Sequence, residues 1–125
     1  MDIKIRSTNF EITPAIGDYV NKKISSLQKF LDPKSQILCE VEIGRTTRHH
    51  KSGDIFRAEV NIRAPGLKQI YAVAEEFDLY AAIDIVRDEA EREIISQKNK
   101  KETLFRRGGQ RIKELLKKVR IYPRR

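Results

Sequence analysis

Three stretches of the chain alternate apolar and polar residues, and this alternation limits the possible folds more than any other feature of the sequence. Every second residue is apolar in residues 37–44. Residues 56–63 and 67–74 repeat the pattern, and so does a shorter stretch at residues 2–8. Successive side chains of a β-strand point to opposite faces, so each stretch predicts a strand with one apolar face. Four such strands predict a sheet that is covered on one side only.

Two segments with helical spacing accompany these strands. Thr13 is suited to cap a helix, and Pro14 to occupy its first position, where a missing N–H costs nothing. This helix is predicted to end before residues 32–33, Asp-Pro. Asp78 is suited to cap a second helix, which is expected to fray at residues 98–101. The predicted buried stripes are Ile16, Val20, Ile24, Leu27 and Leu31 in the first helix, and Leu79, Ala82, Ile83, Val86, Ala90 and Ile94 in the second.

The order β-α-β-β-β-α predicts the α+β class: a two-layer sandwich in which a four-stranded sheet carries two helices on one face. A right-handed crossover through the first helix would make the first two strands parallel. Residues 1–100 are predicted to form a single α+β domain and residues 101–125 a basic C-terminal extension. Beyond Gly108-Gly109, a short segment with apolar residues at helical spacing is marginal as an isolated helix. We expect this segment, with Ile112, Leu115, Leu116 and Val119, to be disordered or to order against a partner.

The net charge of +8 is unevenly distributed along the chain. Residues 98–125 contain 12 basic and 2 acidic residues, whereas residues 1–97 contain 14 basic and 16 acidic residues. A basic block of this kind is attracted to polyanions, to nucleic acid first and to an anionic membrane second. The alternative interpretation is a solvating segment that only prevents aggregation.

Residue types that could support catalysis are poorly arranged. His49 and His50 are adjacent and cannot share one face of a strand or helix at metal-ligand spacing. No G-x-x-x-x-G-K or G-x-S-x-G motif is present, and Cys39 falls on the predicted core face of its strand. A lone cysteine fits a reducing cytosol, and no apolar run is long enough to span a bilayer. We therefore expect a cytoplasmic protein that is not an enzyme, with no metal, cofactor, small-molecule substrate or membrane partner.

Basic side chains are the stronger candidates for function. Lys22 and Lys29 lie two helical turns apart, away from the apolar stripe, and a basic loop separates the second and third strands. If the loop and both helices converge at one end of the sandwich, they form a phosphate-binding surface. Tyr71 is an isolated aromatic on the open sheet face, which favours shape and backbone recognition of folded RNA over base stacking. The candidate RNA-binding residues are Lys22, Lys23, Lys29, Arg45, Arg48, His49, His50, Lys51, Lys98, Lys100, Lys101, Arg106, Arg107 and Arg111.

Two sequence motifs, one at the start of each predicted helix, resemble those of a known family. Residues 13–16, Thr-Pro-Ala-Ile, start the first helix, and residues 78–84, Asp-Leu-Tyr-Ala-Ala-Ile-Asp, start the second. Together with the element order and the basic segment at residues 98–107, they resemble the ribosome hibernation promoting factor family, which includes ribosome-associated inhibitor A. The similarity covers roughly residues 1–107.

The resemblance implies a fold like a double-stranded-RNA-binding domain, bound in the decoding channel of the small ribosomal subunit. The bound protein would overlap the positions of messenger RNA and of A- and P-site transfer RNA, and would inhibit translation in idle or stressed cells. By this analogy, the lysines of the first helix and the cations at residues 98–107 would face ribosomal RNA, and the protein would be a monomer off the ribosome.

The resemblance leaves some points open. Longer members carry a linker and a dimerisation domain, for which the chain is too short, and typical short members lack the segment 112–119. Whether the protein promotes ribosome dimers or keeps ribosomes single therefore stays open. A second function class is a regulatory protein-interaction module that docks through its basic tail on an acidic partner, since relatives have been described as modulators of a sigma factor. A third class is a metal-dependent nuclease that uses His49 or His50.

Overall fold

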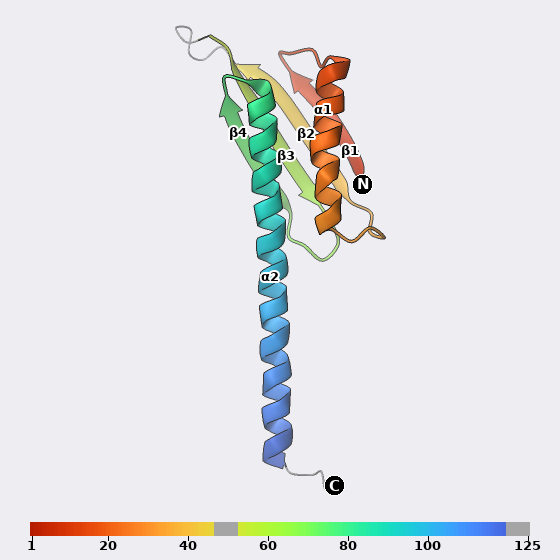
Figure 1. Cartoon of the computed structure of the whole chain (residues 1–125), viewed down its shortest axis with the longest axis vertical. Helices are drawn as coiled ribbons and strands as arrows, with labels where there is room; N and C mark the ends of the chain where they lie inside the picture. Colours follow the sequence, from red (N-terminus) through yellow and green to blue (C-terminus); the bar gives the residue numbers. More distant parts are fainter. Residues whose placement is uncertain (47–52, 120–125) are drawn as a thin grey trace. The chain divides into compact units, whose positions relative to one another are not determined.

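A computed structural model describes residues 1–46 and 53–119 of the chain, without the side-chain surroundings of residues 113–119. The α+β class and the predicted order of four strands and two helices are confirmed, and a short 3₁₀ segment follows the first helix (Figure 1). The likeness to a double-stranded-RNA-binding domain stays a prediction. The elements are β1 (Asp2–Thr8), α1 (Pro14–Ser25), η1 (Ser26–Phe30), β2 (Leu38–Thr46), β3 (Ile55–Arg63), β4 (Ile70–Glu76) and α2 (Leu79–Val119).

The chain divides into two compact units, Met1–Ile95 and Ser96–Arg125. The first unit holds the sheet, α1, η1 and the first part of α2. The second unit holds the remainder of α2. The predicted domain boundary after residue 100 stays a prediction, and the two units are described separately below.

The sheet of the first unit has the strand order β1-β2-β3-β4. Strand β1 pairs with β2 in parallel, with Thr8 opposite Gly44, and the remaining two pairs are antiparallel. This parallel pairing of the first two strands confirms the prediction made from the sequence. Thr13 caps α1 as predicted, because its side-chain hydroxyl accepts a hydrogen bond from the backbone N–H of Ile16 at 3.3 Å.

The core lies between the helices and one face of the sheet (Figure 1). Alternate residues of β2 and β3 are fully buried, whereas their neighbours on the open face are partly exposed. Each buried aliphatic side chain of this kind stabilises the folded state by about 1.5–3 kcal/mol, which is why the alternation determines which face the helices cover. The fully buried large side chains are Val20, Ile24, Leu27, Val41, Ile43, Val60, Ile62, Ile70, Ile83, Val86 and Ile94.

Helix α2 does not fray at residues 98–101, and the expectation that it would was wrong. Most residues between 97 and 107 are lysine, arginine, glutamine, glutamate or leucine, which all favour a helix. One i,i+4 ion pair adds to this preference, with 2.6 Å between Glu102 Oε1 and Arg106 Nη2. The helix also passes through Gly108 and Gly109, although each glycine costs about 1 kcal/mol relative to alanine.

We predict that Cys39 does not react with iodoacetamide in the folded protein. Its side chain is completely buried, and burial raises the pKa of the thiol to about 11. Because the thiolate is the nucleophile, both effects suppress alkylation. Mass spectrometry should detect the unmodified protein under native conditions and complete alkylation in denaturant. Alkylation of the native protein at the rate of a free thiol would contradict this prediction.

Candidate nucleic-acid interface

The lysines of the first helical segment lie at helix ends. Lys22 and Lys23 belong to the last turn of α1, and Lys29 to the last turn of η1. Cations are favoured there because the C-terminal end of a helix carries a partial negative charge. The tighter 3₁₀ turn rotates Lys29 by roughly 70° from the position it would have in a continuous α-helix, so the three lysines do not form one straight row.

These lysines differ in what their ammonium groups contact. Lys23 Nζ lies 3.5 Å from an Asp84 oxygen and 5.6 Å from the centre of the Tyr19 ring. Lys29 Nζ lies 5.2 Å from the centre of the Phe30 ring. Neither Lys22 nor Lys29 forms an ion pair within the described part of the chain. These two are therefore better placed than Lys23 to contact phosphate.

A polar cluster that the sequence did not predict joins α1 to α2 within the first unit. The Tyr19 hydroxyl donates a hydrogen bond of 2.6 Å to Asp84, and the Tyr19 and Tyr80 rings meet edge to face at 4.8 Å. Nearby, Arg87 Nε donates to the Ser26 hydroxyl at 2.9 Å. Tyr19 and Asp84 each adjoin a buried residue of their helix, but they are 65 positions apart in the sequence. A single sequence contains no pattern that predicts a hydrogen bond between them. This cluster holds Lys23 in place.

We predict that Tyr19→Phe lowers the free energy of unfolding by about 1 kcal/mol, because it removes the hydrogen bond to Asp84. That hydrogen bond, together with burial, raises the pKa of Tyr19 from 10.0 to about 12. The raised pKa means that its contribution to stability is complete below pH 10 and is lost as the pH rises towards 12. Urea unfolding of wild type should therefore show a loss of stability in this pH range that the phenylalanine variant lacks. Parallel curves for the two proteins would contradict the assignment.

The basic loop and the ends of the helices were predicted to meet at one end of the sandwich, but Arg45 lies at the other end of the sheet from Lys29. Arg45 is near the end of β2, beside the Thr8–Gly44 pair, whereas β2 starts at Leu38 opposite Asp2. Helix α1 begins beside the Arg45 end and runs back towards the Leu38 end (Figure 1). Parallel pairing of β1 and β2 forces this return, so Arg45 and the η1 lysine lie at opposite ends. Arg45 also lies 3.8 Å from the Asp54 carboxylate. The other predicted residues of this loop, Arg48, His49, His50 and Lys51, lie outside the described residues.

The second unit brings the remaining predicted cations together on one helix. Lys98, Lys100, Lys101, Arg106, Arg107 and Arg111 share residues 96–112 with one acidic residue, Glu102. Arg106 is paired with that glutamate at 2.6 Å. Lys100, Lys101, Arg107 and Arg111 form no ion pair with any described residue.

The open face of the sheet carries Tyr71 among charged side chains. Tyr71 is 53% exposed there, but its hydroxyl donates to Glu59 at 2.7 Å, which raises the pKa of Tyr71. Glu59 also pairs with Arg57 at 2.9 Å, so charges of both signs cover this face. The Glu59 carboxylate disfavours phosphate near the tyrosine, and the expectation of little base stacking stays a prediction.

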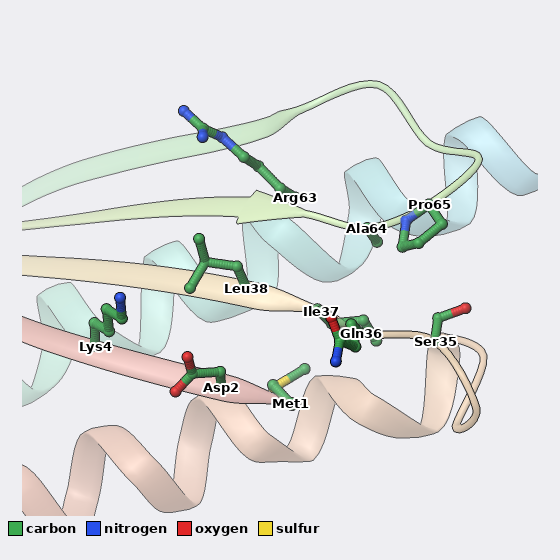
Figure 2. A pocket seen from close by; sticks show the side chains of 10 residues that line it. All are labelled: Met1, Asp2, Lys4, Ser35, Gln36, Ile37, Leu38, Arg63, Ala64 and Pro65. Carbon is green, nitrogen blue, oxygen red and sulfur yellow. The ribbon is translucent and has the colours of Figure 1, made fainter.

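One end of the sheet carries an open hollow of about 730 Å³ (Figure 2). Asp2 and Lys4 reach it from β1, and Arg63 from the end of β3. These side chains mix signs of charge and include no nucleophile beside a base. Across the described ranges, no three His, Cys, Asp or Glu side chains gather as they would around a metal ion. In the same ranges, no helix combines the length and apolar character needed to cross a bilayer.

Comparison with known proteins gives consistent matches. The model of the family described as Sigma 54 modulation protein / S30EA ribosomal protein matches residues 3–102. Ribosome hibernation promoting factor of Klebsiella oxytoca is 34% identical over 100 residues, which are 80% of this chain and 96% of the relative. The protein of the same name from Azotobacter vinelandii is 32% identical over 111 residues, which are 89% of this chain and 94% of the relative.

Two solved structures are similar in fold. The N-terminal domain of Thermus thermophilus Protein Y has a TM-score of 0.65 and 34% identity, over 75% of this chain and 96% of that domain. A ribosomal subunit interface protein from Coxiella burnetii has a TM-score of 0.63 over 79% of this chain and 99% of its own. At 20% identity, the second likeness concerns the fold alone.

Proposed function

The chain belongs to the Sigma 54 modulation protein / S30EA ribosomal protein family, and on this premise we propose that it is a ribosome hibernation factor. It binds the small ribosomal subunit in the decoding channel and inhibits translation in idle or stressed cells. The family match over residues 3–102 carries this proposal, because it covers the sandwich and the first cations of the second unit. Relatives at 32–34% identity are named ribosome hibernation promoting factor.

In this proposal the protein acts by binding RNA phosphates and not by catalysing a reaction. Lys22 and Lys29 offer ammonium groups without an ion pair among the described residues, and the second unit offers six cations over residues 96–112. Lysine binds phosphate as a point charge, and arginine adds a two-pronged hydrogen-bond donor. The protein would act by occupying its site as a cytoplasmic monomer, with no cofactor and no catalytic step. RNA would be recognised by its shape and backbone.

Sedimentation of a cell lysate through a sucrose gradient tests the proposal. We expect the protein to travel with small subunits or whole ribosomes at about 0.1 M salt, and to leave them as the salt concentration rises. The gradient also separates single ribosomes from ribosome pairs, which decides whether the protein promotes dimers. A protein that stays at the top of the gradient at low salt, in lysate from starved cells, would overturn the proposal.

A second candidate is a regulatory module that binds an acidic protein partner through its basic segment. The words "Sigma 54 modulation" in the family description and the exposed apolar residues Leu104 and Phe105 favour this candidate. Pull-down from a lysate with and without nuclease separates the two functions. A protein partner survives RNA digestion, whereas most ribosomal contacts do not.

A further inference from the structure

The second unit exposes large apolar side chains that the proposed ribosomal function does not use. Leu104 is 64% exposed, Phe105 81% and Ile112 59%. Phe105 and Ile112 are seven residues apart in a continuous α-helix and lie on one side of it, and Leu104 borders the same side. These three residues are called the apolar stripe below. In the sequence, the same helical spacing continues through Leu115, Leu116 and Val119.

Most of the described cations of the second unit lie on the other side of this helix. At 100° per residue, Lys100, Arg106, Arg107 and Arg111 are placed roughly 80° to 140° around the axis from the centre of the apolar stripe. Lys98 and Lys101, in the turns before Leu104, are within about 60° of that centre and form a cationic end to the stripe. From Leu104 to Ile112 the helix is therefore divided lengthwise into an apolar side and a basic side. Between residues 96 and 112 the one acidic residue is Glu102, and it pairs with Arg106 at 2.6 Å.

RNA alone and a second copy of this chain both fit poorly to a helix with one apolar and one basic side. Phosphates of RNA would engage the cations, but would leave the apolar stripe in water and draw no stabilisation from it. A second copy of the chain could cover the stripe, but the pairing would place two strongly basic helices side by side. Residues 96–125 carry 12 basic and 2 acidic residues, so two copies would repel each other. An exposed apolar patch with a cationic border instead requires a partner that is both apolar and anionic.

We propose that the second unit binds the surface of an anionic phospholipid bilayer. The helix lies in the plane of the interface, with the apolar stripe inserted among the acyl chains and the cations beside headgroup phosphates. A bilayer requires only that the two kinds of side chain be segregated, whereas a protein groove also requires matched shape. Surface binding needs no membrane-spanning segment, so this proposal revises the expectation of no membrane partner. It goes beyond the proposed ribosomal function and does not depend on it.

Vesicle flotation with the purified, nuclease-treated full-length chain tests the proposal. The probes are vesicles of phosphatidylcholine alone, and vesicles with about one phosphatidylglycerol for every three phosphatidylcholines, at about 0.1 M salt. We expect the chain to float with the anionic vesicles and to remain in solution with the neutral ones. A chain that floats with neither kind of vesicle would overturn the proposal.

Two triple variants separate insertion from simple charge attraction. Leu104→Gln, Phe105→Gln and Ile112→Gln remove the apolar stripe at constant charge, and Lys100→Gln, Arg107→Gln and Arg111→Gln remove charge with the stripe intact. Each set is expected to weaken vesicle binding at least tenfold, because surface anchoring here needs both contributions. Glutamine favours a helix, so neither set disrupts the secondary structure.

Binding of the apolar-stripe variant to small ribosomal subunits distinguishes this proposal from the proposed function. It should sediment with subunits as wild type does. Flotation equal to wild type would mean that charge alone attracts the chain, and would overturn the proposal. Loss of subunit binding would place the stripe on a ribosomal partner and would also overturn it. Flotation by wild type without any subunit binding would instead refute the ribosomal function and leave this proposal standing.

Discussion

Replacing Lys22, Lys23 and Lys29 by glutamate is expected to weaken binding to purified small ribosomal subunits by on the order of a hundredfold or more at about 0.1 M salt. Each phosphate contact raises the affinity nearly tenfold when the salt concentration falls tenfold, from about 1 M to about 0.1 M. Loss of three contacts should therefore lower the affinity at about 0.1 M salt by a factor of roughly 100 to 1,000. Reversal of charge adds repulsion to this loss. Filter binding or sedimentation with labelled protein measures the change directly.

The three lysines should not contribute equally to that loss. Lys23 already interacts with Asp84 at 3.5 Å and with the Tyr19 ring, so less of its charge is available to RNA. The pair Lys22→Glu and Lys29→Glu should therefore keep most of the effect. As acids at helix C-terminal ends, they should lower the free energy of unfolding by about 1 kcal/mol. Lys23→Glu places a carboxylate beside Asp84 and should also destabilise the fold. Thermal unfolding of each variant separates a weakened interface from a weakened fold.

Replacing His49 and His50 by alanine is the control for this experiment. These residues belong to the basic loop predicted from the sequence, but Arg45 at its border lies at the opposite end of the sheet from Lys29. We expect the histidine variant to bind small subunits within about threefold of wild type, since histidine as a residue type carries less charge than lysine at pH 7 and so releases fewer counterions. Equal losses in the lysine and histidine variants would mean that the RNA-binding face has been misplaced.

The fold was predictable because its determinants are local. The alternation in residues 37–44 identifies the buried face of β2, and Cys39, Val41 and Ile43 are fully buried as that pattern requires. The cap formed by Thr13 involves a backbone N–H three residues along the chain, so its signal is contained within one turn. Short-range rules of this kind depend on backbone geometry and need no knowledge of the tertiary structure.

The candidate site was less predictable because it depends on contacts between distant residues. The ammonium of Lys23 is held by a carboxylate 61 positions away, and no periodicity in one sequence identifies that partner. The expected convergence of Arg45 with Lys29 was wrong because it treated the loop and the helix end as neighbours. The parallel pairing of β1 with β2 places them apart. The charge composition predicts a polyanionic ligand, whereas the topology of the sheet determines which cations are close enough to bind the same ligand.

The prediction for the second unit was wrong for a different reason, which concerns two glycines in its helix. Gly108 and Gly109 suggested a break before a marginal short helix, but α2 is continuous through them. Glycine weakens a helix by about 1 kcal/mol without forbidding it, and the flanking lysine, arginine and leucine residues favour the helical state. An existing helix also extends without a second nucleation cost, which a separate short segment would carry.

Neutralising four cations of the second unit is expected to have the largest effect on affinity. Lys100, Lys101, Arg107 and Arg111 form no ion pair with a described residue, and replacement of all four by glutamine keeps the helical preference. If all four contact phosphate, the slope of log affinity against log salt should become shallower by roughly 3 to 4. Binding to small subunits at about 0.1 M salt should then fall on the order of a thousandfold.

The salt titration of wild type provides the reference for this variant. With roughly six phosphates neutralised, its affinity should fall on the order of a thousandfold between about 50 and about 200 mM monovalent salt. The matched control replaces Glu102 and Arg106 by glutamine, which removes an ion pair of 2.6 Å without a change in net charge. Its slope should shift by less than about one, because Arg106 is already neutralised. A flat titration of wild type, or equal slopes for wild type and the fourfold variant, would show that these cations do not face RNA.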